Sequence, residues 1–267
     1  MRQELYDTRF PKPANAIDLF EDEWTGAIPA FISKRAKFYD DPKIALWEDA
    51  VGGFSGKRIL ELGPLEASHT YALECRGAAN ILAIEANTHA FLRCLVVKEL
   101  LHLKARFLLG DFCKYLQSST SSFDLILASG VIYHMMDPLS LIENMTRNTS
   151  VIAAWTHYYD PEILIGHKLL GTKYTHLPIM KAFHGVNIDL YEQRYLDAFT
   201  NSAFTGGTEA TSMWISKNGI TTAFDRLGYD ILVVLEEPAH PNGPAFAFVA
   251  KRRATAVSRV FRTFGLG

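Results

Sequence analysis

Cysteine is scarce in this chain and long apolar runs are missing, and each shortage excludes a class of protein. The three cysteines, Cys75, Cys94 and Cys113, lie far apart and form neither a Cys-x-x-Cys pair nor a zinc-ligand spacing. We therefore expect free thiols, no metal centre and a reducing, cytoplasmic location. No stretch approaches the ~18–20 apolar residues of a membrane helix, and the N-terminus has no apolar signal core. We expect no integral membrane association.

An excess of positive charge is also missing. Lysine and arginine number 27 against 29 aspartates and glutamates, so the formal net charge is −2. Such a chain has no overall electrostatic footprint for nucleic acid, and a nucleic-acid partner is possible but not favoured. The content of 48% hydrophobic and 21% charged residues predicts a well-filled core. The length of 267 residues suits one α/β domain with an embellishment, or two small domains.

Glycine is sparse in the turn after the first predicted strand, where a dinucleotide site would need it. An apolar strand at 59–62 enters a turn at Gly63, a helix is expected next, and a second strand ends in Glu85. This order is a nucleoside-binding half-fold, in which the acid accepts hydrogen bonds from the ribose. A dinucleotide site needs glycine at the first, third and sixth turn positions, which here hold Gly63, Leu65 and Ser68. The turn therefore argues against NAD or FAD and favours S-adenosylmethionine, which has no pyrophosphate.

Strands and helices alternate through much of the chain. Strands are expected at 59–62, 81–85, 106–109, 123–128 and 150–155, and helices at 68–76, 88–103 and 138–147. Alternation predicts an α/β, Rossmann-like, mostly parallel sheet with right-handed crossovers. A helix at 218–227 and strands at 230–235 and 245–250, joined by a Pro-Asn-Gly turn, add an antiparallel C-terminal hairpin. The sheet then has seven strands.

Departures from this alternation set the expected domain boundaries. We predict an N-terminal extension with helices over 1–55 and an S-adenosylmethionine-binding domain over 56–252. Within that domain, residues 158–214 lack a clean period and are predicted to be an inserted lid or subdomain.

The last segment, 253–267, is predicted to be a basic C-terminal tail. It carries an apolar stripe at helical spacing, formed by Val257, Val260, Phe261 and Phe264. Such a stripe is typical of a helix that docks on its own domain or on a second copy, with weak binding to a membrane surface or RNA as the alternative. The oligomeric state stays open.

The carboxyl ends of the strands predict the cofactor site, because ligands of such sheets bind there. Glu85 is expected to hold the ribose, and Gly130 to leave room beside the sulfonium. Asp111 can accept from the adenine amino group while Phe112 covers its face, or Asp111 can simply cap the next helix. The predicted cofactor-binding residues are Glu61, Gly63, Leu65, Glu85, Ala86, Asn87, Asp111, Phe112, Ser129 and Gly130.

The segment after the fourth strand carries a resemblance to a known family. It reads Ser129-Gly130-Val131-Ile132-Tyr133-His134. With the acid-tipped second strand and its following helix, it resembles the bacterial class I methyltransferases related to the tRNA wobble-uridine carboxymethyltransferase. The resemblance implies S-adenosylmethionine as cofactor and places Tyr133 and His134 at the site.

Two departures from that family alter the expected chemistry. The tRNA enzyme pairs the extra carboxylate of a carboxylated cofactor with an arginine near the start of the last strand, where this chain has Ala245. Its long basic N-terminal region also has no counterpart here. The departures favour ordinary S-adenosylmethionine and a substrate other than tRNA.

The fifth strand ends in His157, which is predicted to lie at the active edge. An imidazole titrates near neutrality and can act as a general base for an acceptor hydroxyl. Tyr158 and Tyr159 are expected to wall the acceptor pocket. The alternative is a buried, hydrogen-bonded histidine packed among aromatic rings, since methyl transfer from a sulfonium can proceed by positioning alone.

These patterns together predict a methyltransferase that uses S-adenosylmethionine. The expected acceptor is the oxygen or nitrogen of a small-molecule or glycan-like compound, with His157, Tyr133 and His134 as the catalytic candidates. The alternatives are a tRNA-modifying methyltransferase and a non-catalytic protein that binds S-adenosylmethionine.

Overall fold

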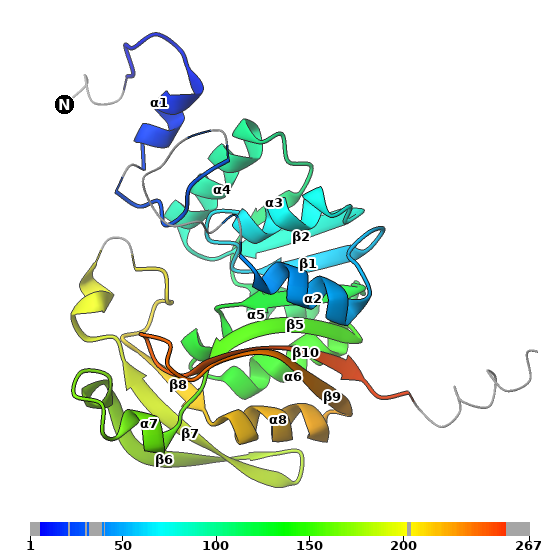
Figure 1. The fold of residues 1–267 in the computed structure, drawn as a ribbon, viewed down its shortest axis with the longest axis vertical. Coiled ribbons are helices and arrows are strands. Elements are labelled where there is room, and N and C mark those ends of the chain that lie inside the picture. The colour runs from blue at the N-terminus through cyan, green and yellow to red at the C-terminus, as the bar shows by residue number, and fades with distance from the viewer. Residues whose placement is uncertain are drawn as a thin grey trace, which may run out of the picture. The chain divides into compact units, whose positions relative to one another are not determined.

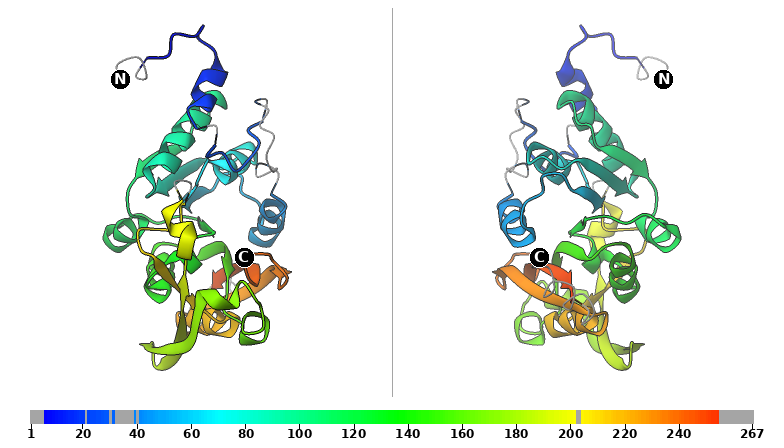
Figure 2. Two further views of the ribbon diagram at one scale, coloured as in Figure 1. Left: turned by 90° about the vertical axis from the view of Figure 1, so that its left-hand side faces the viewer. Right: turned by 90° about the vertical axis from the view of Figure 1, so that its right-hand side faces the viewer.

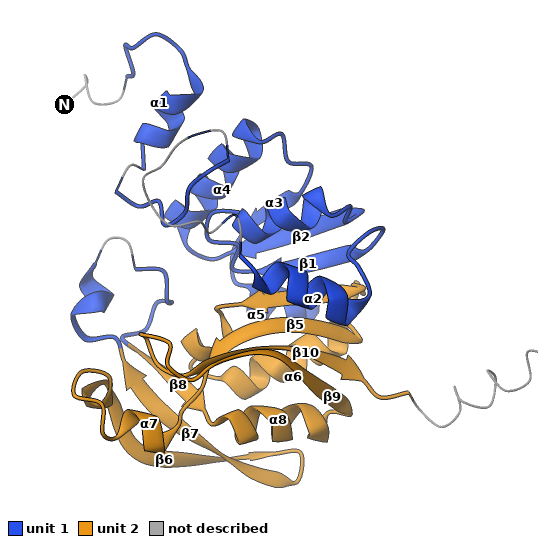
Figure 3. Cartoon of the chain, viewed as in Figure 1, with its two compact units in different colours: residues 1–119, 195–210 blue, residues 120–194, 211–267 orange. Residues whose placement is uncertain are grey.

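The computed structural model describes residues 6–20, 22–29, 31, 39, 41–201 and 204–254. The chain divides into two compact units (Figure 3), one of residues 1–119 with 195–210 and the other of residues 120–194 with 211–267. The predicted apolar stripe of the C-terminal tail lies outside the described residues. No helix within the described ranges is long and apolar enough to cross a membrane.

The main sheet has seven strands in the order β3-β2-β1-β4-β5-β10-β9, which confirms the predicted α/β fold. Its first three strands belong to the first unit, where β2 pairs in parallel with both β1 and β3. The elements of this unit (Figure 1) are α1 (Pro13–Asp18), α2 (Lys43–Val51), β1 (Arg58–Leu62), α3 (Ser68–Cys75), β2 (Asn80–Glu85), α4 (Thr88–Leu100), β3 (Arg106–Leu109), α5 (Phe112–Ser118) and η5 (Leu196–Thr200).

The other four strands of the main sheet belong to the second unit. There β4 and β5 are parallel, and β10 runs antiparallel between β5 and β9. The elements are β4 (Leu125–Ser129), η3 (Ile132–His134), α6 (Pro138–Asn148), β5 (Val151–His157), α7 (Pro161–Leu164), η4 (Gly171–Lys173), β6 (Tyr174–Phe183), β7 (Val186–Arg194), β8 (Thr211–Ile215), α8 (Lys217–Arg226), β9 (Tyr229–Glu237) and β10 (Ala245–Arg252).

Strand β10 is the core of this second unit. Its first six residues, Ala245 to Ala250, are all 0% exposed. A strand buried on both faces reads as a continuous apolar run, which is the pattern of this segment. Strand β10 of the hairpin therefore lies inside the sheet, between β5 and β9, and β9 forms the edge of the sheet.

A separate three-stranded antiparallel sheet, β6-β7-β8, occupies much of the segment predicted to be an inserted lid or subdomain. Helix α8 contacts both β7 and β9, so it lies between this small sheet and the hairpin (Figures 1 and 2). The pairing of β6 with β7 shifts register between Tyr174 and Pro178. That irregularity breaks the two-residue period, which is why the sequence pattern showed no strand there.

Candidate active site

The turn after β1 adopts the conformation of a glycine-rich turn with few glycines. Gly63 has φ +66°, and Leu65 and Ala67 also lie in the left-handed region, at +57° and +60°. The Gly63 N–H donates to the Ile84 carbonyl at 2.9 Å and ties the turn to β2. Because Leu65 and Ser68 carry side chains where a dinucleotide fingerprint has glycine, the turn does not match a pyrophosphate site.

Glu85 is the acid at the end of β2, and its side chain is only 7% exposed. Its Oε2 accepts from the Leu65 N–H at 3.0 Å, and its Oε1 accepts from the Asn87 N–H at 2.9 Å. Burial raises the pKa of Glu85, and backbone N–H donors, including that of Ala86, oppose the rise. Glu85, the acid predicted to bind the ribose, is therefore hydrogen-bonded to the turn after β1.

Two neighbours of Glu85 have supporting roles. Asn87 caps α4, since its Oδ1 accepts from the Ala90 N–H at 2.9 Å. Its Nδ2 also donates to the Phe204 carbonyl at 3.4 Å. Glu61 is 2% exposed and accepts from the Thr70 hydroxyl, and burial raises its pKa. Glu61 thus lies beneath the turn and braces the start of α3.

Asp111 caps the next helix, which was the alternative to its predicted contact with adenine. Its Oδ1 accepts from the backbone N–H groups of Cys113, at 2.8 Å, and Lys114, at 3.3 Å, so it caps α5. The side chain is nevertheless exposed, while Phe112 beside it is 8% exposed. Capping explains the residue type structurally, and contact with adenine stays a prediction.

In the second unit, β4 ends at Ser129 and Gly130. The Gly130 N–H donates to the Trp155 carbonyl at 2.9 Å, which continues the β4–β5 pairing. A Cβ added to Gly130 would meet a single atom within 4 Å, the Tyr133 hydroxyl at 3.9 Å. The space over Gly130 is therefore open, and the phenol of Tyr133 borders it.

His157 lies at the centre of a cluster of rings in the same unit. Its ring centroid is 4.6 Å from that of Tyr133, 4.8 Å from Trp155 and 4.9 Å from His240. Trp214 stacks on it at 5.1 Å with an interplanar angle of 9°. The side chain is 4% exposed.

The hydrogen bonds of His157 fix its tautomer. Nδ1 lies 2.8 Å from the Gly243 carbonyl oxygen and 3.3 Å from that of Pro244. A carbonyl only accepts, so Nδ1 carries the proton and, in the neutral ring, Nε2 carries the lone pair. Burial lowers the pKa of His157 to about 4, and His240 contributes to the decrease. The ring is neutral at physiological pH.

His134 occupies a similar environment. Its ring lies 4.1 Å from that of Tyr133. Burial lowers the pKa of His134 to about 3, and His157 adds to the effect. Both predicted histidines are therefore neutral groups within the ring cluster.

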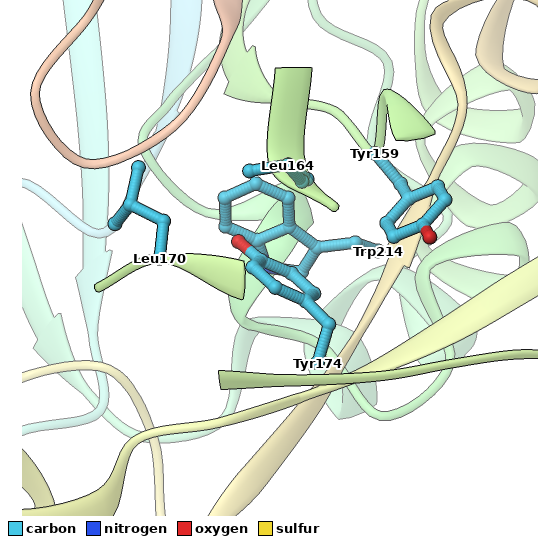
Figure 4. Close-up of a cluster of buried hydrophobic side chains, with 5 residues drawn as sticks. All are labelled: Tyr159, Leu164, Leu170, Tyr174 and Trp214. Carbon is cyan, nitrogen blue, oxygen red and sulfur yellow. The ribbon is translucent and has the colours of Figure 1, made fainter. Parts of the chain in front are cut away.

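Tyr158 and Tyr159, predicted to wall the acceptor pocket, pack in two different places. Tyr159 joins a buried cluster with Leu164, Leu170, Tyr174 and Trp214 (Figure 4). Tyr158 instead packs edge-on against Phe246 at 5.7 Å. Successive side chains of an extended segment point to opposite sides, so the two tyrosines cannot wall the same space.

Trp214, His240 and Gly243 were not predicted as site residues. His240 and Gly243 reach His157 because β10 pairs antiparallel with β5, with Ala245 opposite His157. The indole N–H of Trp214 is buried and has no hydrogen-bond partner in the part of the chain that the structure describes. Local sequence gave no signal for these residues, whose role depends on strand register.

Comparison with known proteins bears on the fold. The model of a methyltransferase domain matches residues 60–150. No curated protein matches the chain. The N-terminal domain of EvdMO1, solved in the presence of S-adenosylhomocysteine and D-fucose, is similar with a TM-score of 0.65 at 19% identity, covering 95% of this chain and 97% of that one.

Two further solved structures share the fold. Magnesium protoporphyrin IX methyltransferase from Synechocystis PCC 6803 has a TM-score of 0.56 at 12% identity, covering 94% of this chain and 92% of that one. The 1,6-didemethyltoxoflavin-N1-methyltransferase of Burkholderia thailandensis has a TM-score of 0.52 at 9% identity, covering 93% and 94%.

The chain has the class I methyltransferase fold, and its residues 60–150 match the model of a methyltransferase domain. S-adenosylmethionine is the implied cofactor, and the acid-tipped β2 with its pyrophosphate-excluding turn fits that ligand. Methyl transfer dependent on S-adenosylmethionine is the activity that these findings support. Within the described residues, no group of three or more His, Cys, Asp or Glu side chains is arranged to hold a metal ion.

Proposed function

We propose that this protein transfers a methyl group from S-adenosylmethionine to a hydroxyl oxygen of a small, glycan-like acceptor. The observation that carries the proposal is His157, which has the buried, ring-packed environment given above as the alternative to a base, but whose Nδ1–H is held by the Gly243 carbonyl so that Nε2 keeps its lone pair. A base in that state can take the proton of a hydroxyl through Nε2. An amine nitrogen as acceptor stays a second possibility on the same machinery.

The first unit is proposed to hold the nucleoside part of the cofactor. Glu85 accepts from the ribose hydroxyls, with Ala86 and Asn87 alongside, and Phe112 covers the adenine whose amino group faces Asp111. Glu61, Gly63 and Leu65 form the turn around the methionine part. The buried carboxylate of Glu85, already aligned by two backbone N–H donors, supports this assignment.

The second unit is proposed to supply the acceptor site. Ser129 and Gly130 lie beside the sulfonium, and Tyr133 and His134 line the acceptor with Trp214. The buried indole N–H of Trp214, without a partner among the described residues, is a donor that an acceptor oxygen can complete. Aromatic rings around a few polar atoms suit the apolar faces and hydroxyl edges of a sugar.

The cofactor supplies a methyl group carried on a positively charged sulfur. With the cofactor bound, His157 Nε2 would take the proton of the acceptor hydroxyl as that oxygen receives the methyl group, and the sulfur would leave as a neutral thioether. The ring cluster excludes water and orients the acceptor. Positioning alone contributes much of the rate, since this transfer is intrinsically downhill.

The solved neighbours support a small acceptor. One was crystallised with D-fucose, and two others methylate a tetrapyrrole and a toxoflavin precursor. Nothing in them favours the predicted relation to the tRNA carboxymethyltransferase, which remains a prediction. A tRNA-modifying enzyme and a non-catalytic binding protein remain the alternatives.

The decisive experiment measures S-adenosylhomocysteine formation and product mass for a panel of neutral sugars, amino sugars and bulk tRNA. We expect a mass increase of one methyl group on a sugar hydroxyl, and for His157→Ala a turnover lower by on the order of 100-fold with unchanged cofactor binding. Methylation only of tRNA, with salt-dependent binding, would support the first alternative. Cofactor binding with no turnover on any acceptor would support the second.

A further inference from the structure

The turn between β9 and β10 controls the chemistry of His157 from outside the strand that carries it. This turn runs from residue 238 to residue 244, between Glu237 and Ala245. The carbonyls of Gly243 and Pro244 are the acceptors of the His157 Nδ1–H. The proton on Nδ1, and hence the lone pair on Nε2, depends on where this turn places two backbone oxygens.

The turn is fixed by its own hydrogen bonds. The Gly243 N–H donates to the His240 carbonyl at 3.0 Å, and the Tyr158 N–H donates to the Pro244 carbonyl at 3.0 Å. The second bond ties the turn to the residue directly after His157. The spacing between imidazole and carbonyl is therefore set by backbone on both sides.

Gly243 also fits closely against the ring that stacks on His157. A Cβ at this position would lie 3.1 Å from Trp214 Cη2 and 3.2 Å from Trp214 Cζ3. These distances are shorter than ordinary van der Waals contact, so a side chain would push Trp214 or the turn aside. The residue has φ +114°, which L side chains rarely adopt.

We propose that Gly243 is a positioning residue, which holds His157 with its proton on Nδ1 and lets Trp214 stack on the ring. Glycine is required because any side chain would disturb both contacts at once. This inference rests on the proposed function, in which Nε2 is the base. It assigns a catalytic consequence to a turn outside the strand that carries His157.

The test compares Gly243→Ala with a matched control, Gly185→Ala. Gly185 lies in the turn between β6 and β7 with φ +81°, and a Cβ there would meet nothing within 4 Å. Both variants carry left-handed strain, and only the first meets Trp214. Long-range proton–nitrogen NMR of protein labelled with ¹⁵N-histidine reports which ring nitrogen of His157 is protonated, and His157→Gln assigns the signals.

We expect the wild type and Gly185→Ala to show the proton on Nδ1. Gly243→Ala should lose that signature, and its kcat should fall on the order of tenfold or more while cofactor affinity stays within about threefold of the wild type. The double variant Gly243→Ala/Trp214→Phe removes the two clashing ring atoms. It should regain the Nδ1–H signature, and it provides the measurement if Gly243→Ala alone does not fold.

A wild-type proton on Nε2, or an unchanged His157 signature and turnover in Gly243→Ala, would overturn the inference. The outcome is separable from that of the proposed function. If the tautomer shifts as expected but no acceptor is methylated by the wild type, the positioning of His157 stands and the proposed function fails. If acceptors are methylated but Gly243→Ala behaves as Gly185→Ala, the positioning inference alone fails.

Discussion

At the scale of single residues, the two parts of the proposed site use burial in opposite ways. Burial raises the pKa of Glu85, and hydrogen bonds from backbone N–H groups oppose that rise. His157 is desolvated and stays neutral, with its proton placed by a carbonyl. The hydrogen-bond partners of each side chain explain the difference. In the proposed function, Glu85 serves as a carboxylate for the ribose hydroxyls and His157 serves as a neutral base for the acceptor.

The Glu85 carboxylate should dominate cofactor affinity. In the proposed site, Glu85→Ala would remove two charge-assisted hydrogen bonds to the ribose, each worth ~1.5–3 kcal/mol at most. We expect calorimetry to show affinity for S-adenosylhomocysteine reduced at least tenfold, on the order of the smaller of those values. Glu99→Ala, an exposed acid on α4, is the control and should bind like the wild type. Equal affinities in the two variants would refute the ribose assignment.

The Tyr133 hydroxyl borders the open space over Gly130. Tyr133→Phe keeps the ring contacts with His157 and removes only this oxygen. We expect steady-state turnover to fall roughly tenfold, the effect of one lost hydrogen bond in a transition state, with cofactor affinity within a few-fold. Tyr6→Phe, at a side chain 73% exposed, controls for the substitution. Full activity of Tyr133→Phe would remove the hydroxyl from the mechanism.

At the scale of secondary-structure elements, helix caps and strand starts decide whether a polar residue is structural or functional. Asp111 begins α5 and satisfies two of its first N–H groups. Ala245 begins β10 and is fully buried opposite His157. In each case the place in the element limits the chemistry available to the side chain.

Substitution by serine separates the two roles of Asp111. Serine caps helices nearly as well as aspartate but is too short to reach an adenine amino group. We expect Asp111→Ser to unfold in urea within about 0.5 kcal/mol of the wild type and to bind S-adenosylhomocysteine several-fold more weakly. Asp111→Ala should lose about 1 kcal/mol of stability. Wild-type affinity in the serine variant would leave capping as the role of this residue.

The start of β10 predicts the form of the cofactor. On the resemblance inferred from the sequence, Ala245 would stand where the carboxymethyltransferase family has an arginine. Arg252, at the other end of the strand, donates to the carbonyls of Thr146 and Thr149. A carboxylate added to the transferred group would lack a cationic partner at Ala245, and burying it unpaired is costly. Competition binding should therefore favour S-adenosylmethionine over its carboxylated form by at least roughly tenfold. A preference for the carboxylated form would show the alignment to be wrong.

At the scale of the whole molecule, the neutral histidines make stability depend on pH. His157 and His134 have pKa values of about 4 and about 3 in the folded chain, below the ordinary 6.5. Groups with lowered histidine pKa contribute stability that is present above the unfolded pKa and is lost as pH falls toward the folded one. The folded protein should weaken between pH 6.5 and pH 4.

The contribution of His157 can be isolated by His157→Gln, which keeps a donor and does not titrate. We expect the wild type to lose on the order of 2 kcal/mol more unfolding free energy than the variant between pH 7.5 and pH 5. Urea unfolding at the two pH values measures the difference. The other titratable groups that face this cluster are the same in both proteins. They are His240, His134 and Glu237, which accepts a hydrogen bond from the Trp155 indole N–H. Parallel losses in the two proteins would contradict the lowered pKa.

The sequence by itself predicted the seven strands of the main sheet and helices α3, α4, α6 and α8 in their order along the chain, because hydrophobic period and turn residues are local properties. It also determined Glu85 as the acid at the end of β2, since a carboxylate directly after a strand lies at the ligand edge wherever the strand sits in the sheet. The exclusion of a dinucleotide likewise followed from Leu65 and Ser68 alone.

Only the tertiary structure decided the protonation state and the contacts of His157. Its partners, Gly243 and Trp214, are far from it in sequence and reach it through the register of β10 on β5 and through the second sheet. Register is set by packing over whole strands, and no local pattern states which two residues will face each other. The tautomer of the imidazole, its neutrality and the requirement for glycine in the turn follow from those contacts, so none of them could be predicted from the sequence around His157.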